Sequence, residues 1–262
     1  MVKTHYKPSK YLSSYVDRYF VCKQNIGLPL ILPGTGLELL FHLNKPLSID
    51  GVSLPKAHTI CPRTAIQFDH NNHIEYLAVR FKSGAFRHFT SIPYFNIVNQ
   101  YLSVEDIWSI DGKQLSQQLN DLTLIEEKIK CIEIFLLKKL SKYKSTESVH
   151  WNASLHQLYR EFNSISFLDL ALKCNISYRQ YERNFKQKFG ITPKKFQRIT
   201  RLQKTAKEVL LNKTDSYLHI ALDNGYYDQS HFIKEFKNLS GITPSEYFIK
   251  DNFSNHFYYK SI

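Results

Sequence analysis

The sequence predicts a two-domain α+β protein, in which an amino-terminal β domain with a helical tail precedes a carboxy-terminal all-α domain. The chain has 262 residues, more than the roughly 100 to 150 residues of a common single domain. Short β-type runs come before a region of helical periodicity. The tetrapeptide Gly-Ile-Thr-Pro occurs twice, at residues 190–193 and 241–244, which indicates a duplicated unit. We therefore expect the β domain at 1–142, a linker at 143–153, the helical domain at 154–250 and a tail at 251–262.

The charge of the chain favours an anionic partner. Thirty-five Lys and Arg oppose 23 Asp and Glu, a net charge of +12, and residues 165–201 hold nine basic and two acidic side chains. Such an excess is typical of proteins that bind nucleic acid or a membrane surface. The four cysteines form no C-x-x-C pair, and no apolar run approaches the roughly 18 residues of a membrane span. We expect a cytoplasmic protein without a zinc cluster or another cofactor.

Short apolar runs between about Val21 and Phe81 predict the β domain. The runs LPLIL, LELLFHL and EYLAVRF are separated by Pro, Gly, Asn and Asp, as in a small β-sandwich or barrel. Residues 123–142 then carry an apolar stripe at helical spacing, made of Ile125, Ile129, Ile132, Phe135, Leu136 and Leu140. This helix either packs on its own domain or pairs with a second copy to form a homodimer.

The repeated tetrapeptide closes two similar units. Ser177 and Asp228 are suitable N-caps. Aromatic residues follow four and eight positions after each cap, so one face of each helix should point into a core; they are Tyr181, Phe185, Phe232 and Phe236. A short helix precedes each cap, at 167–173 and 218–223, which gives two helix-turn-helix units. Within the tetrapeptide, Gly ends one helix in a left-handed conformation, Thr caps the next and Pro fills its first turn.

The second helix of a helix-turn-helix unit lies in the major groove of DNA, so its exposed face can read bases. The two exposed faces carry Arg179, Glu182, Arg183 and Lys186, then Gln229, Ser230, Ile233, Lys234 and Lys237. Arg can pair with guanine and Gln with adenine through two hydrogen bonds each. Glu182 could instead form an ion pair with Arg179 or Lys186 on its own helix. A connecting helix over residues 193–211 would be about 28 Å long, close to the roughly 34 Å between successive major grooves.

Residues 154–248 resemble the DNA-binding domain of AraC/XylS-type bacterial transcription regulators. The resemblance extends over both units and their spacing, through Ala171, Ser177, Arg183, Phe185, Lys186, Gly190, Pro193, Arg201, Leu202, Ala221, Gly225, Tyr226, the run from Asp228 to Phe232, Phe236, Lys237, Gly241, Pro244 and Tyr247. It implies base contacts from Arg179, Glu182, Arg183, Gln229, Ser230, Ile233 and Lys234. We expect phosphate contacts, which position the protein without reading sequence, from Lys186, Lys194, Lys195, His231 and Lys237. The implied partners are double-stranded promoter or operator DNA and RNA polymerase.

The first 145 residues resemble the domain that precedes the DNA-binding region in one subgroup of these regulators. The matching stretches are YKPSKYLSSYVDRYF, LPGTGLELLFHL, VRFKSGAFRHFTSIP and LSVEDIWSIDGKQLSQQL. The subgroup implies a cupin-like β domain with a helical tail, control by a small-molecule effector of undefined identity, and a homodimer through the 123–142 helix. Glu38, Arg63 and Arg80 are candidates for the effector site, together with Arg87, although each Arg could equally be a surface charge.

Histidine positions give little support to a metal site. His70 and His73 have H-x-x-H spacing, but no third ligand stands at a telling distance and the two Asn between them indicate a loop. His42 and His58 alternate with apolar residues and should lie in the core. The alternative function is a metal-dependent cupin-type enzyme with a DNA-targeting domain, although no nucleophilic or paired-carboxylate arrangement is readable. Binding of membranes or RNA by charge alone would leave the duplicated, capped units unexplained.

Overall fold

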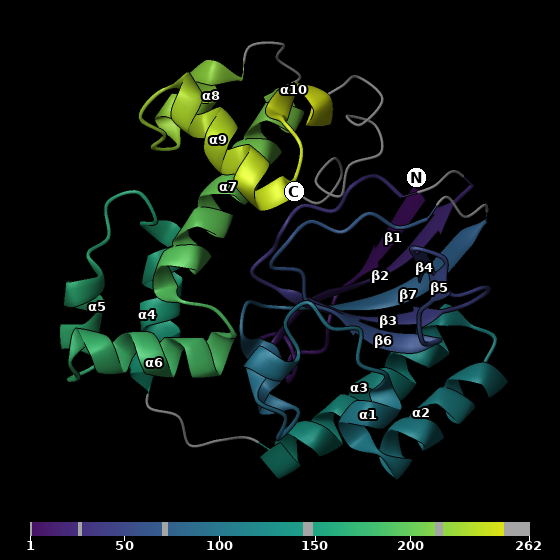
Figure 1. The fold of residues 1–262 in the computed structure, drawn as a ribbon. Coiled ribbons are helices and arrows are strands. Elements are labelled where there is room, and N and C mark those ends of the chain that lie inside the picture. The colour runs from purple at the N-terminus through teal and green to yellow at the C-terminus, as the bar shows by residue number, and fades with distance from the viewer. Residues whose placement is uncertain (1, 26–27, 70–72, 144–148, 213–216, 249–262) are drawn as a thin grey trace.

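The amino-terminal half is built on a five-stranded antiparallel sheet. The computed structural model describes residues 2–25, 28–69, 73–143, 149–212 and 217–248 (Figure 1). The strands lie in the order β1 (Val2–Tyr6), β2 (Val16–Gln24), β7 (Ile74–Phe81), β3 (Leu37–His42) and β6 (Ala57–Ile60). A separate hairpin pairs β4 (Ser48–Ile49) with β5 (Val52–Ser53). The predicted β domain is therefore confirmed, and its cupin-like character stays a prediction.

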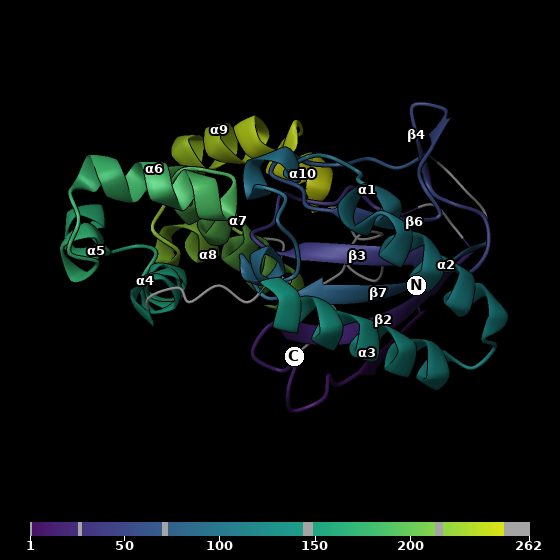
Figure 2. The same cartoon turned by 90° about the horizontal axis from the view of Figure 1, so that it is seen from below.

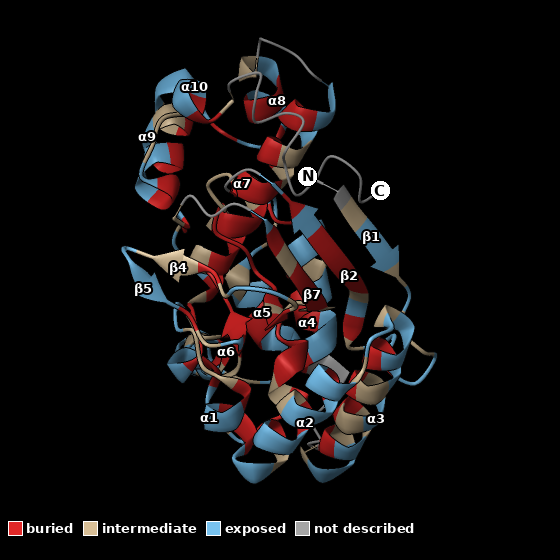
Figure 3. Ribbon diagram, turned by 90° about the vertical axis from the view of Figure 1, so that its right-hand side faces the viewer, coloured by how far each residue is buried: buried red, intermediate tan, exposed pale blue. Residues whose placement is uncertain are grey.

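Alternate residues of the sheet enter two different cores. Leu39, Leu77 and Val79 pack with residues of the helical tail, which contains α1 (Val104–Trp108), α2 (Ile110–Asp121) and α3 (Ile125–Tyr143). Figure 2 shows α2 and α3 lying across this face of the sheet. Leu40 and Ala78 enter the other core, together with loop residues on both sides of the β4–β5 hairpin. In Figure 3 the buried residues follow β2 and β7, whereas α2 and α3 turn exposed residues outward.

Helix α3 confirms the helix predicted at residues 123–142. Its apolar stripe lies in the core of its own domain, where Ile129, Ile132 and Leu136 are buried. Packing on its own domain is one of the two alternatives that the sequence leaves open. The outer face carries Ile134, whose side chain is 70% exposed. A homodimer through α3 therefore stays a prediction, and it would have to use this outer face.

The strands differ from the sequence prediction at the start of the β region. β1 and most of β2 precede Val21, where the predicted region begins. The run LPLIL forms no strand, and Ile31 makes only an isolated β-bridge with Ile66. Pro29 within this run has no amide hydrogen to donate to a neighbouring strand. Pro29 therefore explains why an apolar run of this length stays irregular.

Helices make up the described part of the carboxy-terminal half. They are α4 (Val149–Arg160), α5 (Phe167–Lys173), α6 (Tyr178–Phe189), α7 (Pro193–Asn212), α8 (Leu218–Asp223), α9 (Gln229–Ser240) and α10 (Pro244–Tyr247). They share one core, which includes Leu158, Leu202 and Ala221. Helix α4 begins within the predicted linker, and its Trp151 belongs to this core. Residues 144–148 and the predicted tail lie outside the described part of the chain. None of the helices in the described residues is long and apolar enough to cross a membrane.

The two halves touch at the end of α6. The turn after α6 lies on the 3-10 helix η2 (Tyr94–Asn96), and the Phe189 ring packs on Gly84. The Arg87 guanidinium lies over the same ring, 5.2 Å from its centroid. From the loop before β3, Leu32 enters the helical core. The first helix-turn-helix unit is therefore attached to the β domain by side chains from both halves.

Candidate nucleic-acid interface

Helix α6 presents a basic face and buries an aromatic one. The Ser177 hydroxyl accepts a hydrogen bond from the Gln180 amide at 3.3 Å, and Gly190 follows the helix with a φ of 79°. The predicted cap and the predicted stop are both confirmed. The buried face consists of Tyr181, Phe185 and Phe189. The opposite side presents the exposed Arg179, Arg183 and Lys186 and the half-buried Glu182.

Tyr181 attaches α6 to α4. Its ring stacks on Trp151, with centroids 5.3 Å apart and an interplanar angle of 11°. Its hydroxyl shares a hydrogen bond with the Ser154 hydroxyl at 2.7 Å. Burial raises the pKa of Tyr181 to about 12, so the phenol stays protonated near neutral pH. Ser154 is therefore the partner that a buried tyrosine hydroxyl requires here.

Helix α9 repeats the arrangement of α6. The Asp228 carboxylate accepts a hydrogen bond from the His231 amide at 2.7 Å, and Gly241 follows the helix with a φ of 82°. Phe232, Phe236 and Leu239 are buried. The other side presents the exposed Gln229, Ser230, Lys234 and Lys237 and the half-buried Ile233. We call α6 and α9 the reading helices, because each is the second helix of a helix-turn-helix unit.

The two Gly-Ile-Thr-Pro segments end and restart helices as predicted. The Thr192 hydroxyl accepts a hydrogen bond from the Lys195 amide at 3.2 Å. The Thr243 hydroxyl accepts one from the Glu246 amide at 3.3 Å, and the Glu246 carboxylate accepts one from the Thr243 amide at 2.6 Å. This reciprocal pair is a capping box. The prolines of both segments are the first residues of α7 and α10.

Helix α7 holds both reading helices on one side of the helical domain. It has 20 residues and is therefore about 30 Å long, close to the roughly 34 Å between successive major grooves. Figure 1 places α6 at the start of α7 and α9 further along it. In Figure 2 both reading helices lie along the upper side, with α4 and α8 below them. The exposed faces of α6 and α9 could therefore enter successive grooves of one duplex.

A buried carboxylate ties α9 to α7. The Glu235 side chain is 8% exposed and lies 3.2 Å from Nε of Arg198 and 3.3 Å from Nη2 of Arg201. His231 Nε2 lies 3.6 Å from the same carboxylate. Two guanidinium groups give the buried charge the partners that it requires. This cluster was absent from the sequence prediction, although Glu235 follows Phe232 by three positions and therefore falls on the core-facing side of its helix.

The residues expected to contact phosphate differ in exposure. Lys186, Lys194 and Lys237 are exposed, and the Lys194 ammonium donates to Gln197 Oε1 at 3.2 Å. Lys195 is half-buried, and burial lowers its pKa, with the charge of Arg198 as a second cause. Among the described side chains, Glu182 forms no ion pair with Arg179 or Lys186. All of these DNA contacts stay predictions.

The predicted effector residues make contacts within the β domain. Glu38 and Arg80 form an ion pair with each other at 2.7 Å. Arg63 is 1% exposed, and its guanidinium donates to the carbonyl groups of Thr35 and Gly36 at 3.1 Å each. Arg63 therefore fixes the loop that precedes β3. None of the three residues is among the described residues that line the cavity between the sheet and the α2–α3 turn, and their effector role stays a prediction.

The histidines divide between the core and the surface. His42 and His58 are buried, as the sequence predicts. His70 lies outside the described residues, whereas His73 Nδ1 lies 3.2 Å from Asn25 Oδ1. Within the described ranges, no three His, Cys, Asp or Glu side chains gather in a way that could hold a metal ion.

Most of the helical half matches a known protein family. Residues 170–249 match a family model described as "Helix-turn-helix domain", and this span contains α6, α7, α9 and both tetrapeptides. These residues are an AraC-type helix-turn-helix domain. Residues 4–103 match a model described as "Domain of unknown function (DUF6597)", which spans the five-stranded sheet. The AraC-type domain therefore follows a β domain of a family without an assigned role.

Curated relatives match this chain over short segments. The HTH-type transcriptional regulator MtrA of Neisseria gonorrhoeae is 42% identical over 74 residues, 28% of this chain and 24% of MtrA. The uncharacterized HTH-type transcriptional regulator YisR of Bacillus subtilis is 35% identical over 103 residues, 38% of this chain and 35% of YisR. This chain thus spans only about a quarter to a third of the length of these relatives. A solved structure of ToxT from Vibrio cholerae aligns with 87% of this chain over 96% of the ToxT chain. The two share 15% identity, and the TM-score is 0.45.

Proposed function

We propose that this chain is a sequence-specific DNA-binding transcription regulator, which reads two adjacent major grooves and responds to a small molecule bound by its β domain. The observation that carries this proposal is the pair of reading helices on one side of α7. Each has a capped start, a glycine stop, a buried aromatic face and an exposed polar face. The similarity to MtrA and YisR, which are named as transcriptional regulators, supports the same role.

The exposed positions suit two different kinds of DNA contact. Arg179 and Arg183 on α6 and Gln229 on α9 carry groups that pair with base edges in the major groove. Lys194 follows the tetrapeptide at the start of α7, where an ammonium group can contact the phosphate backbone. Base contacts specify the sequence, whereas phosphate contacts add affinity for any duplex. The two groups of residues should therefore respond differently to substitution.

Control by the β domain would act through the contact at the end of α6. In this proposal residues 1–142 are the sensing region and residues 154–250 the DNA-binding region, and α4 packs with the DNA-binding region. Phe189 and Gly190 lie against residues of the β domain, so the position of α6 depends on that domain. A ligand with different affinities for two arrangements of this contact would shift their populations. A homodimer would double the phosphate contacts.

A gel-shift titration tests the central claim. The full chain is incubated with a duplex selected from a random library and with a scrambled duplex, at several salt concentrations. We expect the selected duplex to stay bound at a salt concentration that releases the scrambled one, because base contacts do not depend on counterion release. Equal, steeply salt-dependent retention of both duplexes would rule out sequence-specific reading.

Two alanine substitutions separate base reading from phosphate binding. Arg183→Ala should weaken binding of the selected duplex by about 1 to 3 kcal/mol and relax the preference at one base position. Lys194→Ala should weaken the selected and scrambled duplexes alike, because a phosphate contact carries no sequence information. Dissociation constants for both duplexes, measured by fluorescence anisotropy, provide the comparison.

The exposed Lys113 on α2, outside the proposed interface, provides the matched control. Lys113→Ala removes one positive charge from the β domain and should leave both dissociation constants within experimental error. If Arg183→Ala weakened both duplexes equally, Arg183 would be a phosphate contact and the proposed base-reading role would be wrong.

A further inference from the structure

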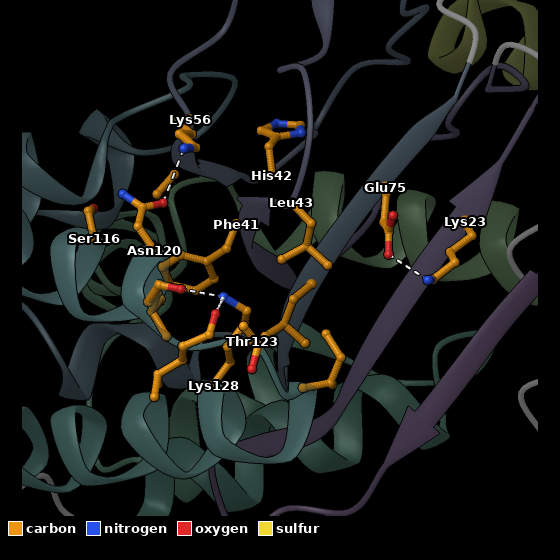
Figure 4. A pocket seen from close by; sticks show the side chains of 15 residues that line it. Lys23, Phe41, His42, Leu43, Lys56, Glu75, Ser116, Asn120, Thr123 and Lys128 are labelled. Carbon is orange, nitrogen blue, oxygen red and sulfur yellow. Dashed lines mark hydrogen bonds and ion pairs between the residues drawn. The ribbon is translucent and has the colours of Figure 1, made fainter.

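A cavity of about 620 Å³ opens between one end of the sheet and the turn that joins α2 to α3 (Figure 4). Its walls come from the ends of β2, β3, β6 and β7, the last turn of α2 and the first turn of α3. Sites for small organic molecules have volumes of roughly 300 to 1,000 Å³. The cavity therefore has the size of a small-molecule site.

Apolar side chains line part of the cavity, beside the polar and charged ones. Phe41 and Leu77 come from the sheet and are 5% and 0% exposed, and Leu119 and Ile125 come from the helices. Apolar surface of this kind binds a carbon skeleton by removing it from water. A bare inorganic ion would leave these side chains without a partner. These side chains therefore favour a ligand with an apolar part.

Two ammonium groups lie on one side of the cavity. The buried Lys128 ammonium donates to the carbonyl groups of Leu119 and, at 2.7 Å, Leu122. The Lys56 ammonium donates to Asn120 Oδ1 at 3.1 Å, and Figure 4 shows both contacts on the same side. An ammonium group has three N–H donors. These contacts therefore leave each lysine with donor capacity for a ligand.

The cavity holds an excess of positive charge. Burial lowers the pKa of Lys128, and the charge of Lys56 lowers it further, so the two ammonium groups disfavour each other. Among the described lining residues, the one carboxylate is Glu75, which forms an ion pair with Lys23 at 2.7 Å. An anion between Lys56 and Lys128 would favour the charged form of both.

A structural role accounts for Lys128 but not for Lys56. The two carbonyl groups that Lys128 contacts lie at the end of α2, where a cation is favourable. Lys56 precedes β6, and its contact is the exposed side chain of Asn120. Capping of α2 therefore explains the position of Lys128, whereas Lys56 is an exposed side chain whose ammonium group remains accessible to a ligand.

We propose that this cavity binds a small organic monocarboxylate, with its carboxylate between Lys56 and Lys128 and its apolar part against Phe41 and Ile125. A single carboxylate matches two lysines, because it accepts hydrogen bonds at two oxygens. A phosphate would bring more charge and would leave the apolar side chains without a partner. The ligand would serve as the controlling small molecule, and this regulatory meaning rests on the proposed function.

Calorimetric titration of the full chain tests the proposal. The probes are 3-phenylpropionate, octanoate and indole-3-acetate, each paired with its neutral amide, and inorganic phosphate. We expect at least one carboxylate to bind at one site per chain, at least tenfold more tightly than its amide, and phosphate to give no heat of binding. Absence of binding by all three carboxylates at millimolar concentration, or equal binding of acid and amide, would overturn the proposal.

Three variants locate the site. Lys56→Met should weaken carboxylate binding at least tenfold, whereas Lys130→Met, which removes an exposed charge from α3 outside the cavity, should not change it. Because Lys128→Met could unfold the end of α2, Ser116→Phe is preferred as the second test: Ser116 lines the cavity, and the larger ring would fill it without removing a charge. Unchanged affinity in both Lys56→Met and Ser116→Phe would place any binding elsewhere.

Gel-shift measurements without ligand on the same variants separate this proposal from the function proposed above. Lys56→Met and Ser116→Phe should bind the selected duplex as the unsubstituted chain does, because no residue of α6 or α9 lines the cavity. Figure 1 shows the turn between α2 and α3 on the side of the β domain away from these two helices. Carboxylate binding without selective DNA binding would support the proposed ligand site and contradict the proposed function as a transcription regulator. Selective DNA binding without carboxylate binding would reject only the site.

Discussion

His42 and His58 lie side by side on β3 and β6, with ring centroids 5.2 Å apart and an interplanar angle of 23°. Both side chains are buried, and His58 Nδ1 lies 2.7 Å from the Pro55 carbonyl oxygen, to which it can donate. Burial lowers the pKa of His42 to about 3, with the neighbouring His58 as a second cause. Burial also lowers the pKa of His58 to about 4. Both imidazoles are therefore neutral in the folded protein at neutral pH.

This histidine pair should make the fold sensitive to acid. Each pKa in the folded state lies below the unfolded value of about 6.5. Below that pH the unfolded chain binds more protons, so stability is lost as the pH falls from about 6.5 toward 4. At pH 5 the loss is about 2 kcal/mol for each histidine. His42→Phe should therefore reduce the loss between pH 7.5 and pH 5 by about 2 kcal/mol, measured by urea unfolding.

The exposed His156 on α4 is the matched control. His156→Ala removes a histidine from the surface and should leave the difference in stability between the two pH values unchanged. An equal acid sensitivity in His42→Phe and in the unsubstituted chain would mean that His42 is accessible to protons in the folded state, contrary to its burial.

The sequence predicts which of these side chains are buried but not their partners. Alternation with apolar residues places His42 in the core, and the structure confirms it. Arg63 is different, because an isolated arginine in a loop has no periodicity that distinguishes a surface charge from a buried one. Its guanidinium reaches carbonyl groups 27 and 28 positions earlier in the chain, and pairings over such separations depend on the tertiary fold.

The glycines that end the two reading helices occupy the same conformation in different surroundings. Gly190 and Gly241 have φ values of 79° and 82°, where most residues other than Gly, Asn and Asp are strained by about 1 to 2 kcal/mol. A Cβ atom on Gly241 would meet nothing within 4 Å, whereas one on Gly190 would collide with Val98 and lie 3.3 Å from Tyr94. A substitution at Gly241 therefore tests backbone strain alone, whereas one at Gly190 also tests the contact between α6 and the β domain.

Gly241→Ala should lower the free energy of unfolding by about 1 to 2 kcal/mol, from backbone strain alone. Gly190→Ala should lower it by a further 1 to 3 kcal/mol or so, because the new methyl group overpacks the contact with Val98. Val98→Ala in the Gly190→Ala background should recover part of the additional loss. Urea unfolding of the four chains gives these differences. If both glycine variants lost the same free energy of unfolding, the contact with Val98 would accommodate the new methyl group without destabilising the protein.

Helices of the carboxy-terminal half could be predicted closely because their signals are local. A cap, an aromatic pair four positions apart and a glycine stop all lie within one helix, and the short helices at 167–173 and 218–223 are confirmed. Strand β1 carries only a short signal, since Val2, Thr4 and Tyr6 alternate with Lys3 and His5 over just five residues. Its hydrogen bonds go to β2, as in the pairing of Val2 with Lys23. Its existence depends on a partner, which no short stretch of sequence specifies.

The arrangement of the two halves could not be predicted from the sequence either, because it depends on contacts between residues far apart in the chain. Phe189 is recognisable as a core residue of α6 from its spacing, but some of its contacts come from the β domain, at Gly84 and Arg87. The Arg87 guanidinium also donates to Asn152 on α4 at 2.9 Å. One side chain thus contacts two helices of the other half. We therefore predict that the two halves unfold together, as a single cooperative unit.

The two tryptophans test this cooperativity, because the chain has one in each half. Trp108 is buried against α3 and donates to the Phe89 carbonyl oxygen at 2.8 Å, and Trp151 stacks on Tyr181. Chains carrying Trp151→Phe or Trp108→Phe report one half each by fluorescence. We expect equal urea midpoints from both reporters in the otherwise unsubstituted chain.

Arg87→Ala should then separate the two midpoints, by destabilising the helical half relative to the β domain. The substitution removes a cation–π contact and a hydrogen bond, together about 1 to 2 kcal/mol. Lys82→Ala, an exposed charge in the same segment, should leave the midpoints equal. Because Phe189 of α6 contacts Gly84 and Arg87, a separation would show that the first reading helix is held from outside its own domain. Midpoints that already differ before substitution, or that fall together in Arg87→Ala, would contradict this coupling.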